Sequence, residues 1–306
     1  MMATILITHG VPDRGVEMLQ GHTVLMPAPL QAYTREELQT LIPGADAVLA
    51  AGPLDGETIR LGRRLRVIAN YGAGYDSVDI QTAAACGVPV CNIPAEVADS
   101  TAELAIALML AASRRVGEMN LRLRREPSET LFGMGRHMGR NLRGQTLGII
   151  GMGRIGRRVA EMAGALGMRV IGCTTREGSA SEVAAQADVL SIHCPLNSST
   201  RGMIDASFLS RMKPGAILIN TARGAIVDHD ALADALESGQ LFAAGLDVYP
   251  DEPAVPQRLL SLPQCVMTPH VGANAAETRE AMLRANCRQI LDALEGRRPE
   301  NIVNGL

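Results

Sequence analysis

The chain has 306 residues, of which 47% are hydrophobic and 20% are charged, and this size favours two domains over one. Lysine and arginine number 29 against 32 aspartates and glutamates, a formal net charge of −3, so no general field attracts nucleic acid or an anionic membrane. Aromatic residues make up 2% and tryptophan is absent, which disfavours a base-stacking surface. We therefore expect neither a nucleic-acid partner nor a membrane partner.

The amino-terminal stretch MMATILITHG has no basic segment and no long apolar one, so we expect no signal peptide and a cytoplasmic location. The longest apolar run, residues 104–112, is far shorter than the ~18–20 residues that span a bilayer. The six cysteines form no C-x-x-C pair, so we expect buried, reduced thiols. The histidines have no partners at metal-ligand spacing, so we expect no metal site.

Short apolar runs alternate with helical patterns over the first hundred residues. The runs that we interpret as strands, each bounded by glycine, proline or polar residues, are 4–8, 22–26, 46–50, 65–70 and 88–92. Residues 34–42 predict a helix, because Thr34 followed by Glu37 forms a capping-box pattern. A second helix is expected over 55–65. This alternation predicts βαβ units and a mainly parallel sheet.

A long helix is expected from residue 98 to about 126, with Asp99 or Ser100 as its cap, and a glycine-rich connection follows it. A second series of strands and helices then begins at Thr146. Its expected strands are 146–151, 169–174, 188–193, 216–220, 242–248 and 265–269. Their continuous apolar character predicts a sheet covered on both faces. A last helix is expected over about 275–295.

The stretch GIIGMGRIG places Gly151, Gly153 and Gly156 in G-x-G-x-x-G spacing, after an apolar strand and at the start of a helix. The first glycine permits a tight turn, the second allows close approach of a pyrophosphate, and the third lets the helix pack on the strand. The backbone at Arg154 and Ile155 then presents N–H groups to the anion. This context predicts a dinucleotide site.

An acidic residue normally follows the second strand of such a site and binds the ribose of NAD, but this chain has Thr174, Thr175 and Arg176. Two hydroxyls can donate to a 2′-phosphate, and a guanidinium can pair with its oxygens. The sequence therefore favours NADP(H) as the cofactor. NAD(H) stays an alternative, because Glu177 is one residue late and could still reach the ribose, and Arg176 could be a solvated surface charge.

Three polar residues lie where carboxyl-terminal strands end: Arg223 in LINTARG, Glu252 in GLDVYPDEP and His270 in MTPHVG. Ligands of open α/β sheets bind outside the carboxyl ends of strands. Reduction of a carbonyl compound by hydride needs a cation to hold a carboxylate and polarise C=O, an acid to supply a proton, and a group that supports the acid. Arginine, histidine and glutamate have this chemistry, because a carboxylate beside an imidazole stabilises the imidazolium.

These strings, together with LRVIANYGAGYDSVDI, GVPVCNIPAEVADSTAELAIALMLAASRR, HCPL and TPHVGA, cover essentially the whole chain. They resemble the D-isomer-specific 2-hydroxyacid dehydrogenase family, most of all its glyoxylate/hydroxypyruvate reductases. The resemblance implies an α/β fold of two domains, with a doubly wound Rossmann domain inserted into a smaller flavodoxin-like substrate-binding domain. The Rossmann domain would span 98–286, and the substrate-binding domain 1–97 plus 287–306. The active site is expected in the cleft, and the protein is expected to be a homodimer.

The resemblance also implies roles for individual residues. Arg223 would hold the substrate carboxylate and carbonyl, His270 would donate the proton, and Glu252 would pair with His270. Further substrate contacts are expected at Ala51, Gly52, Ala73 and Gly74. Further cofactor contacts are expected at Thr101, His193, Pro195, Thr221, Ala222 and Asp247.

We expect an NAD(P)-dependent oxidoreductase that reduces a small 2-oxo acid to the D-2-hydroxy acid. One alternative is an NAD-preferring dehydrogenase of the phosphoglycerate or lactate type. Another is a non-catalytic protein that binds dinucleotides as a sensor.

Overall fold

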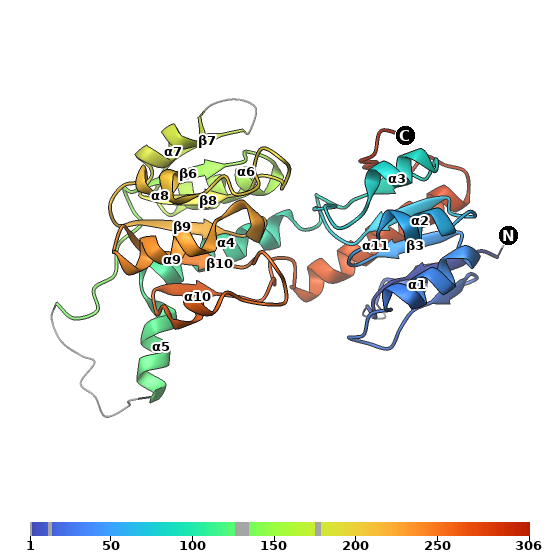
Figure 1. The fold of residues 1–306 in the computed structure, drawn as a ribbon, viewed down its shortest axis with the longest axis horizontal. Coiled ribbons are helices and arrows are strands. Elements are labelled where there is room, and N and C mark those ends of the chain that lie inside the picture. Colours follow the sequence, from blue (N-terminus) through green and yellow to red (C-terminus); the bar gives the residue numbers. More distant parts are fainter. Residues whose placement is uncertain (1, 12–13, 126–134, 175–178) are drawn as a thin grey trace. The chain divides into compact units, whose positions relative to one another are not determined.

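The structure is a computed structural model that describes residues 2–11, 14–125, 135–174 and 179–306. The chain divides into two compact units (Figure 1). Unit 1 comprises Met1–Val97 and Ala273–Leu306, and unit 2 comprises Ala98–Gly272. Both are α/β units built on a parallel sheet, as the sequence predicts.

Unit 1 holds a five-stranded sheet in the order β2-β1-β3-β4-β5, which is the flavodoxin-like order. Its strands are β1 (Thr4–Ile7), β2 (Thr23–Leu25), β3 (Ala47–Ala50), β4 (Val67–Asn70) and β5 (Val90–Cys91). Its helices are η1 (Val16–Leu19), α1 (Arg35–Leu41), η2 (Ile42–Gly44), α2 (Gly56–Leu61), α3 (Ile80–Ala85) and α11 (Ala276–Leu294).

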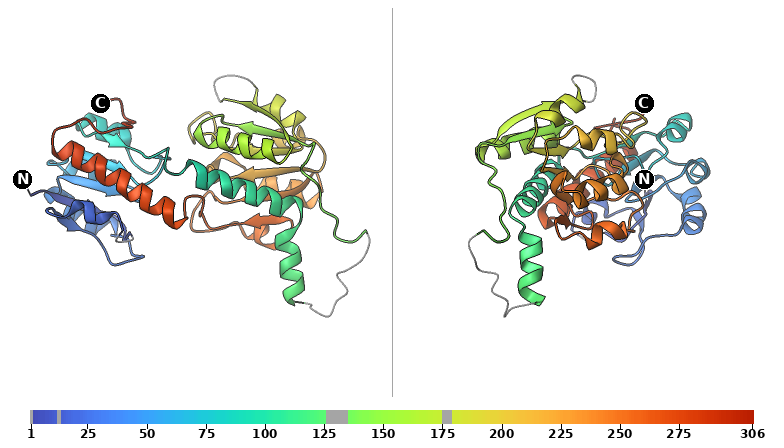
Figure 2. Two further views of the ribbon diagram at one scale, coloured as in Figure 1. Left: turned by 180° about the vertical axis from the view of Figure 1, so that it is seen from behind. Right: turned by 60° about the vertical axis from the view of Figure 1, so that its left-hand side comes forward.

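Alternate side chains of these strands enter two separate cores. Leu6 and Ile68 pack with residues of α1 and α2 on one face, whereas Ile5, Ile7 and Val67 pack with α11 on the other. The alternation follows from the two-residue period of a strand. Figure 2 shows α11 lying along its face of the sheet. The predicted capping box is confirmed, since Thr34 and Glu37 bond each other's backbone N–H.

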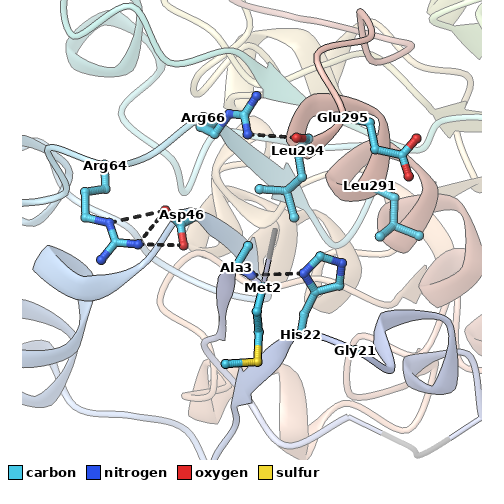
Figure 3. Close-up of a pocket in the computed structure, with 10 residues that line it drawn as sticks. All are labelled: Met2, Ala3, Gly21, His22, Asp46, Arg64, Arg66, Leu291, Leu294 and Glu295. Atoms are coloured by element: carbon cyan, nitrogen blue, oxygen red, sulfur yellow. Dashed lines mark hydrogen bonds and ion pairs between the residues drawn. The ribbon is translucent and has the colours of Figure 1, made fainter.

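At the amino-terminal edge of this sheet lies a cavity of about 420 Å³ (Figure 3). Its charged groups are mutually satisfied. Arg64 pairs with Asp46 at 2.8 Å, and Arg66 donates to the carbonyl oxygen of Leu294 at 2.7 Å. His22 accepts a hydrogen bond at Nδ1 from the backbone N–H of Ala3. Because these groups already bond within the protein, we interpret the cavity as structural and not as a ligand site.

Unit 2 holds a six-stranded parallel sheet in the order β11-β10-β9-β8-β6-β7. Its strands are β6 (Thr146–Ile150), β7 (Arg169–Cys173), β8 (Val189–Ile192), β9 (Ala216–Asn220), β10 (Leu241–Leu246) and β11 (Cys265–Met267). Its helices are α4 (Ala98–Ser113), α5 (Val116–Arg125), α6 (Arg154–Ala165), α7 (Ala180–Gln186), α8 (Ala206–Ser210), η3 (Gly224–Ile226), α9 (His229–Glu237) and α10 (Gln257–Ser261).

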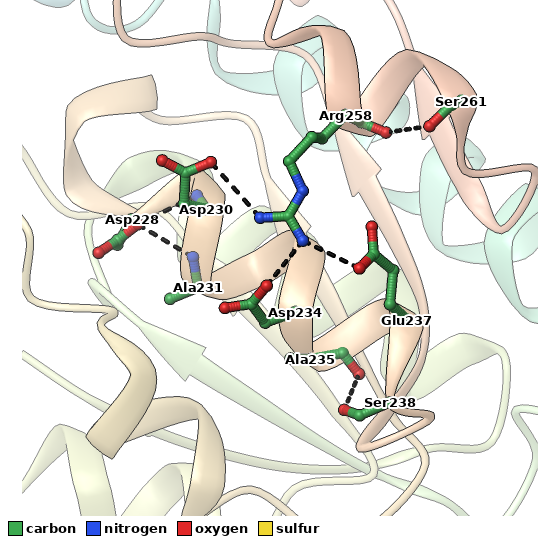
Figure 4. A network of polar contacts seen from close by, with 9 residues as sticks. All are labelled: Asp228, Asp230, Ala231, Asp234, Ala235, Glu237, Ser238, Arg258 and Ser261. Carbon is green, nitrogen blue, oxygen red and sulfur yellow. Dashed lines mark hydrogen bonds and ion pairs between the residues drawn. The ribbon is translucent and has the colours of Figure 1, made fainter.

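Helices cover both faces of this sheet, as the apolar strands predict. Leu147, Ile149 and Ile217 pack with α4 and α6, whereas Leu190 and Leu218 pack on the opposite face with α8 and α9. Arg258 on α10 reaches three carboxylates of α9, with Asp234 at 2.7 Å, Glu237 at 2.9 Å and Asp230 at 3.6 Å (Figure 4). This exposed cluster fixes the approach of α10 to α9 and adds little stability by itself.

Two expectations from the sequence need correction. The helix expected over 98–126 is two helices, because Arg115 takes a left-handed conformation (φ 56°) and the backbone N–H of Arg140 bonds the carbonyl oxygen of Ser113. The return to the first unit lies at Ala273, and residue 287 falls inside α11. The whole of this helix packs on unit 1, through Leu283 and Ile290 among others. In the described parts of the chain, no helix has both the length and the apolarity to cross a membrane.

Candidate active site

The carboxyl ends of the unit 2 strands meet along one edge of the sheet, and most of the predicted site residues follow them directly. In the order of the strands across the sheet they are His270 after β11, Asp247 after β10, Thr221, Ala222 and Arg223 after β9, His193 after β8, Gly151 after β6 and Thr174 after β7. Ionisable side chains thus occupy one end of this edge. The glycine-rich turn occupies the other end.

His270 and Glu252 form an ion-pair geometry at the first end. Glu252 Oε2 lies 2.6 Å from His270 Nδ1, and Oε1 accepts the backbone N–H of Tyr249 at 2.9 Å. The Glu252 carboxylate is therefore held from both sides. The His270 side chain is 50% exposed, so its other ring nitrogen is accessible to a ligand. This arrangement suits a proton donor supported by a fixed carboxylate.

Asp247 holds the turn that carries His270. Its side chain is buried, with Oδ1 accepting from Thr268 Oγ1 at 2.6 Å and from Val271 N–H at 2.8 Å. Oδ2 accepts from Gly272 N–H at 2.8 Å. His270 itself has a left-handed backbone (φ 52°), which a non-glycine residue seldom adopts without such support. The structure thus gives Asp247 an internal task besides the cofactor contact that the sequence predicts.

The loop of Arg223 is shaped by Asn220 and by a close backbone approach. Asn220 Oδ1 accepts the N–H of Ala222 at 3.0 Å, and its Nδ2 donates to the carbonyl oxygen of Arg223 at 2.9 Å. A Cβ atom on Gly224 would lie 2.0 Å from the carbonyl carbon of Tyr249, so only glycine fits there. This contact brings the loop of Arg223 beside the Tyr249–Glu252 segment.

The glycines at the other end of the edge have the geometry of a phosphate-binding turn. Gly151 has a φ of +102°, and a Cβ atom there would lie 2.5 Å from the nitrogen of Cys194. A Cβ on Gly156 would lie 2.1 Å from the oxygen of Gly151. Gly153 faces open space and begins α6, whose first turn has no side-chain cap. With Arg154 exposed beside it, this helix end can accept an anion.

Two buried polar atoms near this edge have no hydrogen-bond partner among the described residues: Nδ1 of His193 and Oγ1 of Thr221. The other ring nitrogen of His193 lies 2.8 Å from Ser191 Oγ. Burial lowers the pKa of His193 to about 4, so the ring is neutral at neutral pH. Because buried polar groups normally find partners, these two atoms fit a bound ligand. The residues present therefore fit a dinucleotide.

The remaining residues that the sequence predicts at the cofactor lie at varied positions. Thr101 on α4 is buried, and its side chain lies beside Gly272. Ile155 packs into the core under α6, and Pro195 is exposed. Thr174 follows β7, but Thr175 and Arg176 lie outside the described residues, as does Glu177.

The substrate residues expected in unit 1 follow two neighbouring strands. Ala51 and Gly52 come after β3, and Ala73 and Gly74 after β4. Asn70 Nδ2 donates to the carbonyl oxygens of Gly72 and Gly74 at 3.0 and 2.9 Å, and Asn92 bonds that of Ala73. These bonds turn the carbonyl groups inward, and the N–H groups of Ala73 and Gly74 are the ones that can face an anion, since that of Gly72 already bonds the carbonyl oxygen of Asn70.

Sequence reasoning missed three residues of the site. Asn220 has a detectable signal, since an asparagine at a strand end often bonds the backbone two residues on. Tyr249 and Thr268 have none, because their roles depend on contacts between β10 and β11. Among the described residues, no group of three or more His, Cys, Asp or Glu side chains could hold a metal ion.

Comparison with known proteins gives consistent results. Residues 106–272 match the family model "D-isomer specific 2-hydroxyacid dehydrogenase, NAD binding domain". The chain is 35% identical to the glyoxylate reductase of Thermococcus litoralis, over 99% of this chain and 97% of that protein. It is 37% identical to the D-3-phosphoglycerate dehydrogenase of Mycobacterium leprae, over 88% of this chain but only 53% of that protein.

A solved structure is also similar over its full length. It is an NADPH-dependent glyoxylate/hydroxypyruvate reductase from Sinorhizobium meliloti, in complex with NADP and malonate. The TM-score is 0.86 at 29% identity, covering 99% of this chain and 97% of the other.

Proposed function

Because the chain belongs to the family of D-isomer specific 2-hydroxyacid dehydrogenases, we propose that it reduces a glyoxylate- or hydroxypyruvate-type 2-oxo acid, preferably with NADPH. The protein is an oxidoreductase, and its unit 2 contains the NAD-binding domain of the family. The observation that carries the proposal is the Glu252–His270 pair on the same sheet edge as Arg223 and the Gly151 turn.

The residues of unit 2 divide the chemistry among them in this proposal. Arg223 binds the substrate carboxylate and polarises the carbonyl group, as a cation does for developing negative charge. A dinucleotide held at the turn of Gly151, Gly153 and Gly156 would supply the hydride for the carbonyl carbon. His270 transfers a proton to the carbonyl oxygen, and Glu252 stabilises the imidazolium before transfer. Asp247 keeps the His270 turn in place through its three hydrogen bonds.

Unit 1 is the substrate-binding unit in this proposal. The backbone at Ala73 and Gly74 binds the carboxylate, because its carbonyl groups are tied to Asn70 and Asn92. Ala51 and Gly52, which follow the neighbouring strand β3, form part of the substrate-binding surface in this proposal.

The preference for NADPH is supported by the residues Thr174, Thr175 and Arg176 after β7. Hydroxyl donors and a guanidinium strengthen the binding of a 2′-phosphate, whereas a carboxylate weakens it. The similar Sinorhizobium meliloti enzyme is NADPH-dependent. Glu177 and the likeness to D-3-phosphoglycerate dehydrogenase favour an NAD-preferring dehydrogenase as the second candidate.

We propose that the protein acts in the cytoplasm as a homodimer. Its six cysteines are free, which fits a reducing compartment. On α5, Val116, Leu121 and Leu123 are 54%, 45% and 50% exposed, and exposed apolar side chains of this size on one helix suit a subunit contact. Light scattering coupled to size-exclusion chromatography tests this: Leu121→Glu with Leu123→Glu should give a monomer where the wild type gives a dimer.

The proposed activity is tested by following NADPH and NADH oxidation with a panel of 2-oxo acids. We expect turnover with glyoxylate and hydroxypyruvate and a higher kcat/KM with NADPH. Turnover that is faster with NADH would support the second candidate. A protein that binds the dinucleotide but oxidises none across the panel would be a sensor.

A further inference from the structure

His9 directly follows β1 at the carboxyl edge of the unit 1 sheet, and its imidazole lies on the backbone of Gly52. A Cβ atom built on Gly52 would lie 2.6 Å from Cε1 of His9 and 3.2 Å from Nε2. Gly52 also has a φ of +144°, a backbone conformation that favours glycine. From the sequence, the small residues Ala51 and Gly52 indicate an open space. The structure fills that space with a histidine ring.

The orientation of this ring is set by Thr8. The buried hydroxyl of Thr8 accepts the backbone N–H of Ala51 at 2.9 Å and lies 3.1 Å from Nδ1 of His9. Having accepted one hydrogen bond, the hydroxyl still has its own proton, and when it donates that proton to Nδ1 the ring proton sits on Nε2. Burial lowers the pKa of His9, so the ring is a neutral hydrogen-bond donor at neutral pH.

The backbone that carries His9 is fixed by the segment before α1. The carbonyl oxygen of Thr8 accepts the N–H of Tyr33 at 3.0 Å, and Gly10 donates to the carbonyl oxygen of Gln31 at 2.8 Å. A Cβ on Gly10 would lie 2.2 Å from the oxygen of Ala28, so the two segments are in close contact. The imidazole therefore has a defined place at the sheet edge.

The imidazole lies at the edge of the sheet that also carries Ala73 and Gly74. It extends from the end of β1 over Gly52, which follows β3, and β3 pairs directly with β4, the strand before Ala73 and Gly74. A substrate whose carboxylate is bound at Ala73 and Gly74 can therefore meet the ring only with a group beyond C2. A two-carbon acid has no such group.

We propose that His9 is a specificity-determining residue, whose Nε2–H recognises a neutral polar substituent on C3 of a substrate whose carboxylate is bound at Ala73 and Gly74. This inference rests on the proposed function and narrows it. The favoured substrate is of the hydroxypyruvate class, ahead of glyoxylate, which lacks C3, and of pyruvate, whose C3 is a methyl group. A neutral ring is also a poorer partner than a cation for a phosphorylated substituent.

The test is the ratio of kcat/KM for hydroxypyruvate to kcat/KM for glyoxylate at saturating cofactor. His9→Ala should lower this ratio at least tenfold, and His9→Gln, whose amide can donate from a similar position, should recover part of it. His22→Ala is the matched control, because His22 lies at the opposite edge of the same sheet and lines the cavity of Figure 3. Its ratio should equal that of the wild type.

The proposal would be overturned if His9→Ala lowered kcat/KM equally for both substrates and lowered the thermal unfolding midpoint as much as His22→Ala does. That result would show a structural role for His9. An unchanged ratio in His9→Ala would overturn the proposal as well. Failure of the proposed function looks different, because the wild type would then reduce neither substrate.

Discussion

The carboxylate of Glu252 bonds His270 Nδ1 at 2.6 Å through one oxygen and the backbone N–H of Tyr249 at 2.9 Å through the other. The position of the carboxylate is thus set by the loop after β10, and it in turn sets the orientation of the imidazole after β11. Two adjacent strands, β10 and β11, carry both members of the pair.

Glu252→Gln should lower kcat about 100-fold, within the range that general acid catalysis contributes. The amide keeps the shape of the side chain but cannot stabilise the imidazolium. The Kd for NADPH, measured by fluorescence titration, should stay within twofold of the wild type. A fall in kcat of less than threefold would show that the pair does not support proton transfer.

Arg223→Ala should abolish turnover and leave dinucleotide binding nearly intact, because the proposal assigns the guanidinium to the substrate and not to the dinucleotide. Arg223→Lys is the matched variant, since it keeps the charge and loses the planar fork. We expect it to retain a small part of kcat/KM, with a raised KM for the 2-oxo acid. Turnover of Arg223→Ala at a wild-type rate would remove Arg223 from the site.

Arg176→Ala should lower the ratio of kcat/KM with NADPH to that with NADH by about tenfold or more, as expected for loss of a charge-assisted bond of about 1.5–3 kcal/mol. The change should fall on NADPH, with little effect on NADH. Glu177→Gln is the comparison, and it should leave the preference for NADPH in place. If the wild type prefers NADH and Glu177→Gln weakens that preference, the ribose is bound by Glu177.

Stability of the apoprotein should fall on acidification between about pH 6.5 and pH 4, partly through His193. Its pKa is about 4 in the folded chain against 6.5 for the free side chain, so the unfolded chain binds more protons in this window. The free energy of unfolding therefore rises with pH here, and protonation disfavours the folded state. The contribution of His193 to this change in the free energy of unfolding is at most about 3 kcal/mol.

Urea denaturation at pH 6.5 and pH 4.5 measures this difference. His193→Gln keeps an amide near Ser191 Oγ and has no proton to gain, so its two curves should lie closer together than those of the wild type. The same separation in both proteins would assign the acid sensitivity to other groups, such as buried His229, whose pKa is also lowered by burial.

Features that depend on local sequence could be predicted from the sequence alone. The capping box of Thr34 and Glu37 and the φ of +102° at Gly151 are examples, since each follows from residues a few positions apart. The same holds for the strand ends that carry Arg223 and His270 on one sheet edge. Their place on one edge follows from the βαβ pattern, which makes the strands parallel.

Features that depend on contacts between distant parts of the chain could not be predicted from the sequence. The break at Arg115 needs a bond between Arg140 and Ser113, and the return to unit 1 at Ala273 needs the packing of all of α11. Glycine at position 52 suggests empty space until His9, 43 positions earlier, is found to fill it. The support that Tyr249 and Thr268 give to the site likewise exists only once β10 and β11 pair.

The turn of His270 follows β11, a three-residue strand at the edge of its sheet, and the bonds of Asp247 hold this turn to the end of β10. Short edge strands open locally at a lower free energy than the body of a domain. On heating, this corner can detach while the remaining strands stay paired. The protein would then lose the proposed proton donor His270 before it unfolds, and the temperature at which activity is lost would fall below the midpoint of global unfolding.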